Sequence, residues 1–245
     1  MNYISINNSK KFSLISGDKN KIHTNKNFTK NLFLRDTVVH GINLVLLGLL
    51  KYFKYKKKIK IINIKINFKN YCLNGEEFSV KLKKNKIFIK NKVNNKVLIQ
   101  LKYSSFRSRV NPLKTDVLTK KIANFYKIKN INNCFDLNLI KHLINISRYV
   151  GSIKPGPGSL IHSINTNKTS DFNNSKKFIK IKKIIRNIYS IKLLNNGYHS
   201  TIISSKLIPV KFKKEKFGLP RNIIKKLKSK KILFFGISGD ISKSI

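Results

Sequence analysis

The chain has 245 residues, of which 41 % are hydrophobic and 10 % aromatic, with a formal net charge of +44 at pH 7. This apolar content is enough to bury the core of one large domain or two small ones, so composition favours a globular protein over a disordered one. No apolar run reaches the roughly 18 to 20 residues that a membrane-spanning helix needs, which excludes that class of protein.

The charge comes from 53 Lys and Arg residues against 9 Asp and Glu residues. It predicts non-specific attraction to nucleic acid or anionic lipid whatever the fold. The lysines are dispersed along the whole chain, and we find no known nucleic-acid-binding motif, so we favour the solvated basic surface of an enzyme. A basic nucleic-acid-binding protein remains an alternative, for which sequence-selective binding would be the evidence.

The first 11 residues lack the basic, apolar and then small residues that make up a secretory signal, and Cys72 and Cys134 have no metal-ligand spacing. Both observations favour a reducing, cytoplasmic location.

Along the first half, residues 11–31 are polar and turn-rich, and residues 37–53 form an apolar stretch at helical spacing that predicts a helix buried on most sides. Strand-like alternation follows, with Ile62, Ile64, Ile66 and Phe68 on one face, and three more strands end near residue 103. The order is one buried helix and then antiparallel strands.

The second half repeats this order. Residues 134–150 predict a helix, which the glycines and prolines of residues 151–158 end. Strand-like segments then cover residues 159–167, 176–194 and 199–212, and a polar loop interrupts them at 168–177. Two similar halves suggest a duplication.

Asp18 and His23 stand five residues apart in the stretch "FSLISGDKNKIHTN". A carboxylate and an imidazole that converge on one water can take a proton from it and return one, as addition of water to a polarised double bond requires. Gly17 and Asn20 tolerate the backbone angles of a turn that would bring the pair together. The alternative is that Asp18 caps a turn and His23 lies on the surface.

His40 and Gly41 stand at the entrance to the first buried helix. Backbone N–H groups at a helix start lack partners within the helix and can hold a developing oxyanion, which a glycine would let a substrate carbonyl approach. Alternatively, Gly41 only lets a strand pass close to the helix.

Together, these stretches resemble the MaoC-like, or type 2 (R)-specific, enoyl thioester hydratases and dehydratases, whose pattern is roughly S-x-D-x-N-P-x-H followed by a V-x-H-G helix. The resemblance extends over residues 12–103, although Lys21 replaces the usual proline and Tyr71 and Cys72 stand where a second proline is expected. The matching positions are Ser16, Asp18, Asn20, His23, Val38, His40 and Gly41.

The resemblance implies an α+β double hot-dog fold: two curved antiparallel sheets, each wrapped on a long helix. We expect an N-terminal hot dog with the hydratase motif at residues 1–104 and a second, non-catalytic, acyl-binding one at residues 105–212. The second half has no matching Asp-to-His turn, so we expect His142 and His162 to be packed or surface histidines.

Residues 213–245 would be a linker and an incomplete Rossmann-like strand and turn. The segment "KKILFFGISGDISKSI" resembles the start of a short-chain dehydrogenase, with Gly236 at the first glycine but Phe235, Asp240 and Ser242 at other motif positions. We interpret the chain as a fragment of a dehydratase fused to a ketoreductase; the alternative is a C-terminal strand and tail of the hot-dog unit.

The implied function is hydration of trans-2-enoyl thioesters, or dehydration of 3-hydroxyacyl thioesters, of coenzyme A or acyl carrier protein in fatty-acid or polyketide-type metabolism. The resemblance gives catalytic roles to Asp18, His23 and Gly41 and substrate contacts to Ser16, Asn20 and His40. It implies no cofactor and no metal.

The partners implied are the thioester substrate, with a homodimer or a fused reductase domain as open alternatives, and no membrane or specific nucleic acid. A catalytically inactive thioester-binding protein is the alternative function. The resemblance predicts that the Asp18 carboxylate, the His23 ring and the Gly41 amide open onto one pocket between the two halves.

Overall fold

The computed structural model describes residues 2–56, 59–105, 116–128, 136–169 and 178–209. All of them belong to one compact unit, Met1–Val210, and a second unit covers Lys211–Ile245. The reductase-like segment expected at residues 213–245 therefore lies outside the described residues.

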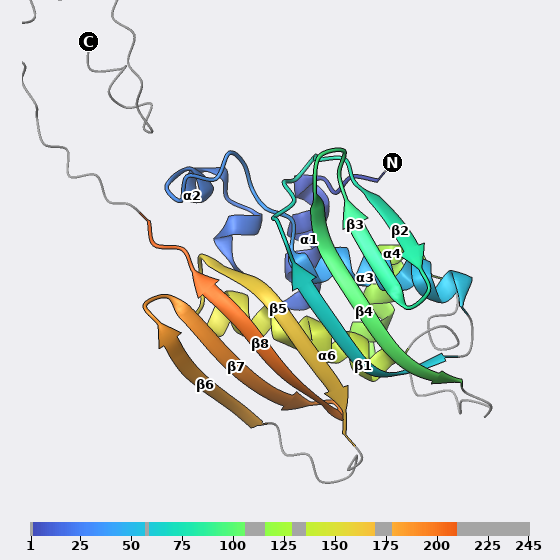
Figure 1. Ribbon diagram of the computed structural model, residues 1–245. Helices are drawn as coiled ribbons and strands as arrows, with labels where there is room; N and C mark the ends of the chain where they lie inside the picture. The colour runs from blue at the N-terminus through green and yellow to red at the C-terminus, as the bar shows by residue number, and fades with distance from the viewer. Residues whose placement is uncertain (1, 57–58, 106–115, 129–135, 170–177, 210–245) are drawn as a thin grey trace, which may run out of the picture. The chain divides into compact units, whose positions relative to one another are not determined.

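Each half of the first unit contains one long buried helix followed by four strands (Figure 1). The first half consists of α1 (Ile6–Ser16), η1 (Lys21–His23), α2 (Lys26–Lys30), α3 (Gly41–Tyr55), β1 (Ile59–Phe68), β2 (Ser79–Lys83), β3 (Lys86–Lys90) and β4 (Asn95–Ser105). The second half consists of α4 (Val117–Tyr126), α6 (Leu137–Arg148), the π-helical turn η2 (Tyr149–Ile153), β5 (Ser159–Lys168), β6 (Phe178–Ile185), β7 (Ile188–Asn195) and β8 (Tyr198–Lys206).

The strands form a single antiparallel sheet in the order β2-β3-β4-β1-β5-β8-β7-β6. Our prediction of two separate sheets is wrong on this point. Within its own half, β1 pairs only with β4 and β5 only with β8, so each has one free edge. Those two edges pair with each other from Asn63↔Asn167 to Asn67↔Ser163, which satisfies backbone groups that would otherwise lie open at two edges.

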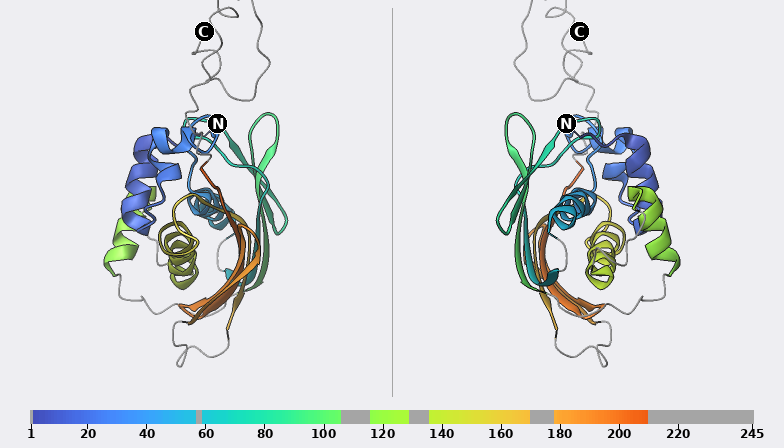
Figure 2. Two further views of the ribbon diagram at one scale, coloured as in Figure 1. Left: turned by 90° about the vertical axis from the view of Figure 1, so that its left-hand side faces the viewer. Right: turned by 90° about the vertical axis from the view of Figure 1, so that its right-hand side faces the viewer.

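The sheet curves around α3 and α6, and α1 and α4 lie on the far side of these two helices (Figure 2). The hydrophobic core fills the space between the sheet and α3 and α6. Within the described residues, no helix is long and apolar enough to cross a membrane.

Helix α3 begins at Gly41, four residues after the predicted apolar stretch starts. Val38 is extended instead: it forms an isolated bridge with Leu73, and its N–H donates to the carbonyl of Ile22 at 2.9 Å. The entrance to the helix therefore lies next to the turn that carries Asp18 and His23.

Among the described residues, helices α1, α2 and α4 were not predicted. Helix α1 occupies part of the segment expected to be turn-rich, because the Ser5 side chain caps its start and Gly17, with φ of 70°, ends it. It buries little beyond Phe12, so its sequence lacks an apolar stripe. Helix α4 begins after Asp116, whose side chain accepts a hydrogen bond from the Thr119 N–H.

Strand β1 differs from the predicted alternation at one position. A register shift between Ile61 and Asn63 turns Ile61 into the core and leaves Ile62 40 % exposed. Ile64 and Ile66 are fully buried as the alternation predicts. A β-bulge of this kind inserts one residue and is invisible in a period-2 pattern.

Candidate active site

The turn after α1 presents the Asp18 carboxylate through local hydrogen bonds. The backbone N–H of Asn20 donates to Asp18 Oδ1 at 3.0 Å, and the N–H of Asp18 donates to Ser16 Oγ at 3.2 Å. Asp, Asn and Ser favour such turns because their short side chains can accept from nearby backbone N–H groups. The positive φ of Gly17 lets the chain leave the helix abruptly.

The second half completes the surroundings of Asp18. Ser147 Oγ, near the end of α6, donates to Asp18 Oδ2 at 2.7 Å. Gly151 packs so closely that a Cβ there would lie 2.0 Å from Asp18 Oδ1. Asp18 is only 3 % exposed, so nearby donors are needed to stabilise its charged form.

Asn20 joins the turn to the segment before β5. Its Nδ2 donates to the Ser159 carbonyl at 3.0 Å, and its Oδ1 accepts from the Gly158 N–H at 2.8 Å. We expected Asn20 to contact substrate. Asn20 does line the pocket, and its side-chain amide forms hydrogen bonds that connect the two halves.

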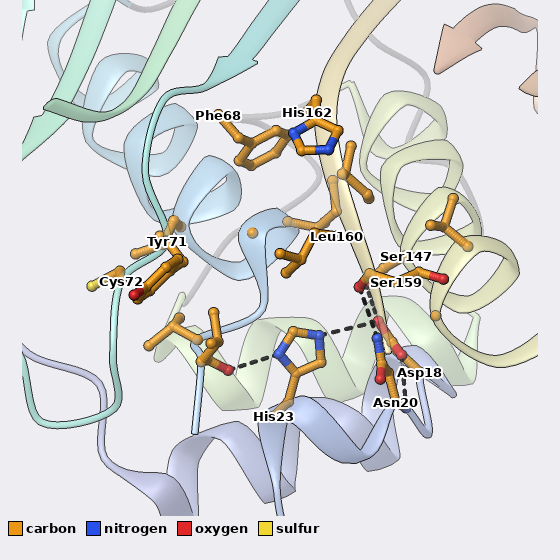
Figure 3. Close-up of a pocket in the computed structure, with 18 of the residues that line it drawn as sticks. Asp18, Asn20, His23, Phe68, Tyr71, Cys72, Ser147, Ser159, Leu160 and His162 are labelled. Carbon is orange, nitrogen blue, oxygen red and sulfur yellow. Dashed lines mark hydrogen bonds and ion pairs between the residues drawn. The ribbon is translucent and has the colours of Figure 1, made fainter. Parts of the chain in front are cut away.

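The His23 ring lies between Asp18 and the Val38 carbonyl, with one ring nitrogen directed at each (Figure 3). Its Nδ1 lies 2.7 Å from the carbonyl oxygen of Val38, which can only accept, so Nδ1 carries the proton. Nε2 is then free to accept and lies 4.0 Å from Asp18 Oδ2. Burial lowers the pKa of His23, and the neighbouring Asp18 charge and the Val38 carbonyl oppose this effect only in part. The neutral ring is therefore the resting form.

His40 stacks behind His23, with ring centroids 3.7 Å apart and ring planes 26° apart. Burial, and then the proximity of His23, hold the pKa of His40 well below its usual range. The His40 ring thus provides a neutral surface that fixes the plane of the His23 ring.

Asp18, His23 and His40 offer ligand atoms within 4.8 Å of one another, a set that could in principle hold a metal ion. A histidine nitrogen binds along a lone pair in its own ring plane. Since the two rings are nearly parallel and stacked, their lone pairs do not converge at the bond length of about 2 Å that zinc or a similar ion requires. The 4.0 Å gap between Asp18 and His23 is better suited to a shared water.

A pocket of about 190 Å³ opens beside this pair, between residues of the two halves. Gly41 lines it as the first residue of α3, where backbone N–H groups have no partner within the helix. A Cβ at Gly41 would lie 2.6 Å from Cε1 of Phe68, so a larger residue here would force the Phe68 ring to shift. The lining also includes Val38, Val39, Ile42, Leu44, Lys69, Asn70, Tyr71, Cys72, Val150, Leu160, Ile161 and His162.

The structure thus brings Asp18, Asn20, His23 and Gly41 to one pocket, whereas Ser16 and His40 lie outside its lining. Both support it from behind, Ser16 through the turn and His40 through the stacked ring.

Sequence reasoning missed Ser147, Gly151 and Ser159. Lone serines carry no motif, and the glycines of residues 151–158 were interpreted only as a helix stop.

His142 is packed, as we expected. It is fully buried, with Nδ1 2.9 Å from the Asn195 carbonyl and Nε2 2.6 Å from Ser200 Oγ. His162 is exposed at the pocket lining, and its Nε2 lies 2.7 Å from Ser205 Oγ.

No protein-family model and no curated protein matches the sequence. Among solved structures, a MaoC-like dehydratase matches with a TM-score of 0.55 and 8 % identity over 84 % of this chain and 95 % of that one. HtdX of Mycobacterium tuberculosis matches with a TM-score of 0.49, 8 % identity and coverage of 84 % and 97 %. A protein described as an oleoyl thioesterase of Lactobacillus plantarum matches with a TM-score of 0.42 and 6 % identity, over 71 % of this chain and 91 % of that one. At these identities the likeness shows the fold alone: the chain has a hot-dog type of fold.

Proposed function

We propose that the chain is a double hot-dog hydratase or dehydratase, which adds water to trans-2-enoyl thioesters of coenzyme A or acyl carrier protein, or removes it from 3-hydroxyacyl thioesters. The observation that carries the proposal is that Asp18, His23 and Gly41, the first residue of α3, line one pocket, with Asp18 Oδ2 and His23 Nε2 4.0 Å apart. The fold of the MaoC-like neighbour supports it.

In the hydration direction, a water between Asp18 and His23 is the nucleophile. His23 Nε2 is neutral and accepts the proton of the water, because Nδ1 already donates to Val38. The water oxygen bonds to carbon 3 of the enoyl group, and the electron pair of the double bond moves to the thioester carbonyl.

The resulting enolate oxygen lies at the Gly41 amide, where the positive end of the α3 dipole stabilises negative charge. The acid–base pair then returns one proton to carbon 2. The sum is one water added and both side chains restored, and dehydration follows the same path backwards.

The second half acts as a support in this mechanism. Ser147 and Gly151 set the orientation of Asp18, and Ser159 holds Asn20. The acyl group would lie along the apolar part of the lining, on Val39, Ile42 and Leu160.

An assay of the hydration of a short trans-2-enoyl-CoA tests the proposal. The reaction is monitored as the loss of absorbance of the conjugated thioester. We expect activity in the wild-type chain and a loss of at least about 100-fold in kcat for Asp18→Asn, because general acid–base groups contribute roughly 10²- to 10⁴-fold.

The matched control is Asp36→Asn, which removes the same charge from a solvent-accessible ion pair with Lys26 and should keep full activity. Absence of activity in the wild-type chain on both the coenzyme A and the carrier-protein thioester, or equal activity of Asp18→Asn and wild type, would contradict the proposal.

A further inference from the structure

A continuous row of basic and amide side chains crosses the whole sheet. Residues that pair directly across neighbouring strands point to the same face. Following the register from β2 to β6 gives one row of paired residues: Lys83, Lys86, Gln100, Lys65, Asn165, Thr201, Lys192 and Lys180.

This basic row lies on the outer face of the sheet. Its lysines and Asn165 are exposed, whereas the next residues along the strands, such as Ile64, Ile99 and Ile191, are fully buried. Helices α1, α3, α4 and α6 all lie on the opposite, inner face (Figure 2).

The outer face carries positive charge without acidic neighbours. The rows on either side of the basic row contain Lys81, Lys102 and Lys182 and no Asp or Glu, and their other members are polar or apolar residues without charge, such as Asn63, Asn167, Leu98 and Phe178. In the described part of the chain, the carboxylates that form ion pairs with lysines lie away from these rows: Asp36 with Lys26, Glu76 with Lys96, Asp116 with Lys141, and Asp136 with Lys168.

The basic row contains two pairs of lysines directly opposite each other, Lys180↔Lys192 on β6 and β7 and Lys83↔Lys86 on β2 and β3. Like charges at directly opposed positions destabilise a sheet. An anion bound along the row would relieve this repulsion.

We propose that the outer face of the sheet binds single-stranded nucleic acid through its phosphates, without reading its sequence. The row spans about 34 Å at a strand spacing of about 4.8 Å. Its lysines supply point charges, and Gln100, Asn165 and Thr201 supply hydrogen-bond donors between them. A chain of phosphates is the anion with matching length and repeated charge.

The curvature of the sheet favours a single strand over the other polyanions. The outer face is convex (Figure 2), and a flexible single strand can follow it along the row. A duplex is stiff over roughly 150 base pairs, so it cannot bend around a convex face and would contact only a short part of the row. A membrane is planar and would touch a convex face over a small area only.

The test compares two variants with the same change in net charge. One replaces Lys65, Lys86, Lys180 and Lys192 of the outer face by Gln; the control replaces the exposed helix lysines Lys10, Lys11, Lys54 and Lys120 by Gln. The probe is a fluorescein-labelled 20-nucleotide single-stranded RNA of mixed sequence, and anisotropy is measured from 0.05 to about 0.3 M NaCl.

We expect the outer-face variant to lose at least about 10-fold in affinity, and the slope of log K against log salt to fall by about 3, since each phosphate contact on a single strand contributes roughly 0.7. The control should stay within about twofold of wild type. Equal losses in both variants would overturn the proposal, because bulk charge would then explain binding.

Two further arms use the matched duplex and phosphatidylserine vesicles. Tighter binding of either one through the same lysines would also overturn the proposal. None of the substituted residues lines the pocket, so hydratase activity and nucleic-acid binding are measured independently and can fail independently.

Discussion

Asp18 is held by groups from both halves of the fold. The Asn20 amide is local, whereas Ser147 and Gly151 come from residues more than a hundred positions later in the chain. In the proposed mechanism Asp18 must keep one orientation to position the water, because a small misplacement of a catalytic group costs much of its rate advantage.

Ser147→Ala removes the donor to Asp18 Oδ2 and leaves the rest of the pocket intact. We expect kcat for enoyl thioester hydration to fall about 10-fold or more with KM within about twofold, because a hydrogen bond to a charged group is worth roughly 1.5–3 kcal/mol. Steady-state kinetics give the two constants separately.

The control is Ser9→Ala, which deletes another buried hydroxyl, bonded at 2.6 Å to Asn74 Oδ1 and outside the pocket lining. It should lower the unfolding midpoint without changing kcat. If both variants change kcat equally, Ser147 has no positioning role.

At the scale of elements, the segment between β1 and β2 forms one wall of the pocket and depends on a buried ion pair. Lys96 Nζ lies 2.8 Å from Glu76 Oε1 and donates to the Tyr71 carbonyl at 2.9 Å. Glu76 also accepts from the Leu73 N–H at 2.9 Å and from Asn91. This network fixes the backbone that carries Tyr71 and Cys72 along the pocket wall.

Cys72 itself is inert in this wall. Burial, and then the charge of Glu76, raise the pKa of its thiol to about 12, so it stays protonated at neutral pH. Its contribution to the pocket is apolar contact.

Glu76→Gln leaves the Lys96 ammonium, 6 % exposed, without a carboxylate. We expect a loss of about 2 kcal/mol in the free energy of unfolding, since a hydrogen bond to a charged group is worth roughly 1.5–3 kcal/mol and Glu76 is partly exposed, and a higher KM because the wall loosens. Urea unfolding and steady-state kinetics measure the two effects.

Asp36→Asn serves as the comparison, because it breaks an exposed pair with Lys26. It should cost less than about 1 kcal/mol. If Glu76→Gln lowers the free energy of unfolding by no more than Asp36→Asn does, the Lys96–Glu76 pair does not stabilise the segment between β1 and β2.

For the whole molecule, buried neutral histidines make stability depend on pH. Burial lowers the pKa of His142 to about 4, whereas in the unfolded chain it titrates near 6.5. Between these values the unfolded chain binds a proton that the folded chain does not, so stability falls as pH decreases. The loss approaches about 3 kcal/mol at pH 4.

His142→Gln should flatten the dependence of the unfolding free energy on pH between 6.5 and 4 by up to about 1.4 kcal/mol per pH unit. Urea unfolding across this range provides the measurement. An unchanged slope in His142→Gln would contradict the assignment.

The sequence predicted the main helix and most strands of both halves. The 3.6 and 2.0 periodicities indicated α3, α6 and most strands, and the resemblance to the MaoC-like motif indicated Asp18, His23 and Gly41, which the fold brings to one pocket. These signals are local, since turn chemistry and periodicity act over a few residues.

What could not be predicted depends on contacts between distant segments. The pairing of β1 with β5 follows from two free strand edges, which no pattern within either strand reveals. Ser147 and Gly151 matter only because α6 ends beside the Asp18 turn.

The joining of the two halves through one sheet also has a genetic consequence. When a site is shared between two identical chains, a chain mutated on one side of the site can pair with a chain mutated on the other side. Some of the resulting dimers then contain one site with no mutation. Here the turn with Asp18 and the helix end with Ser147 are encoded in tandem and paired within the same polypeptide. Two alleles with lesions in different halves should therefore fail to complement each other.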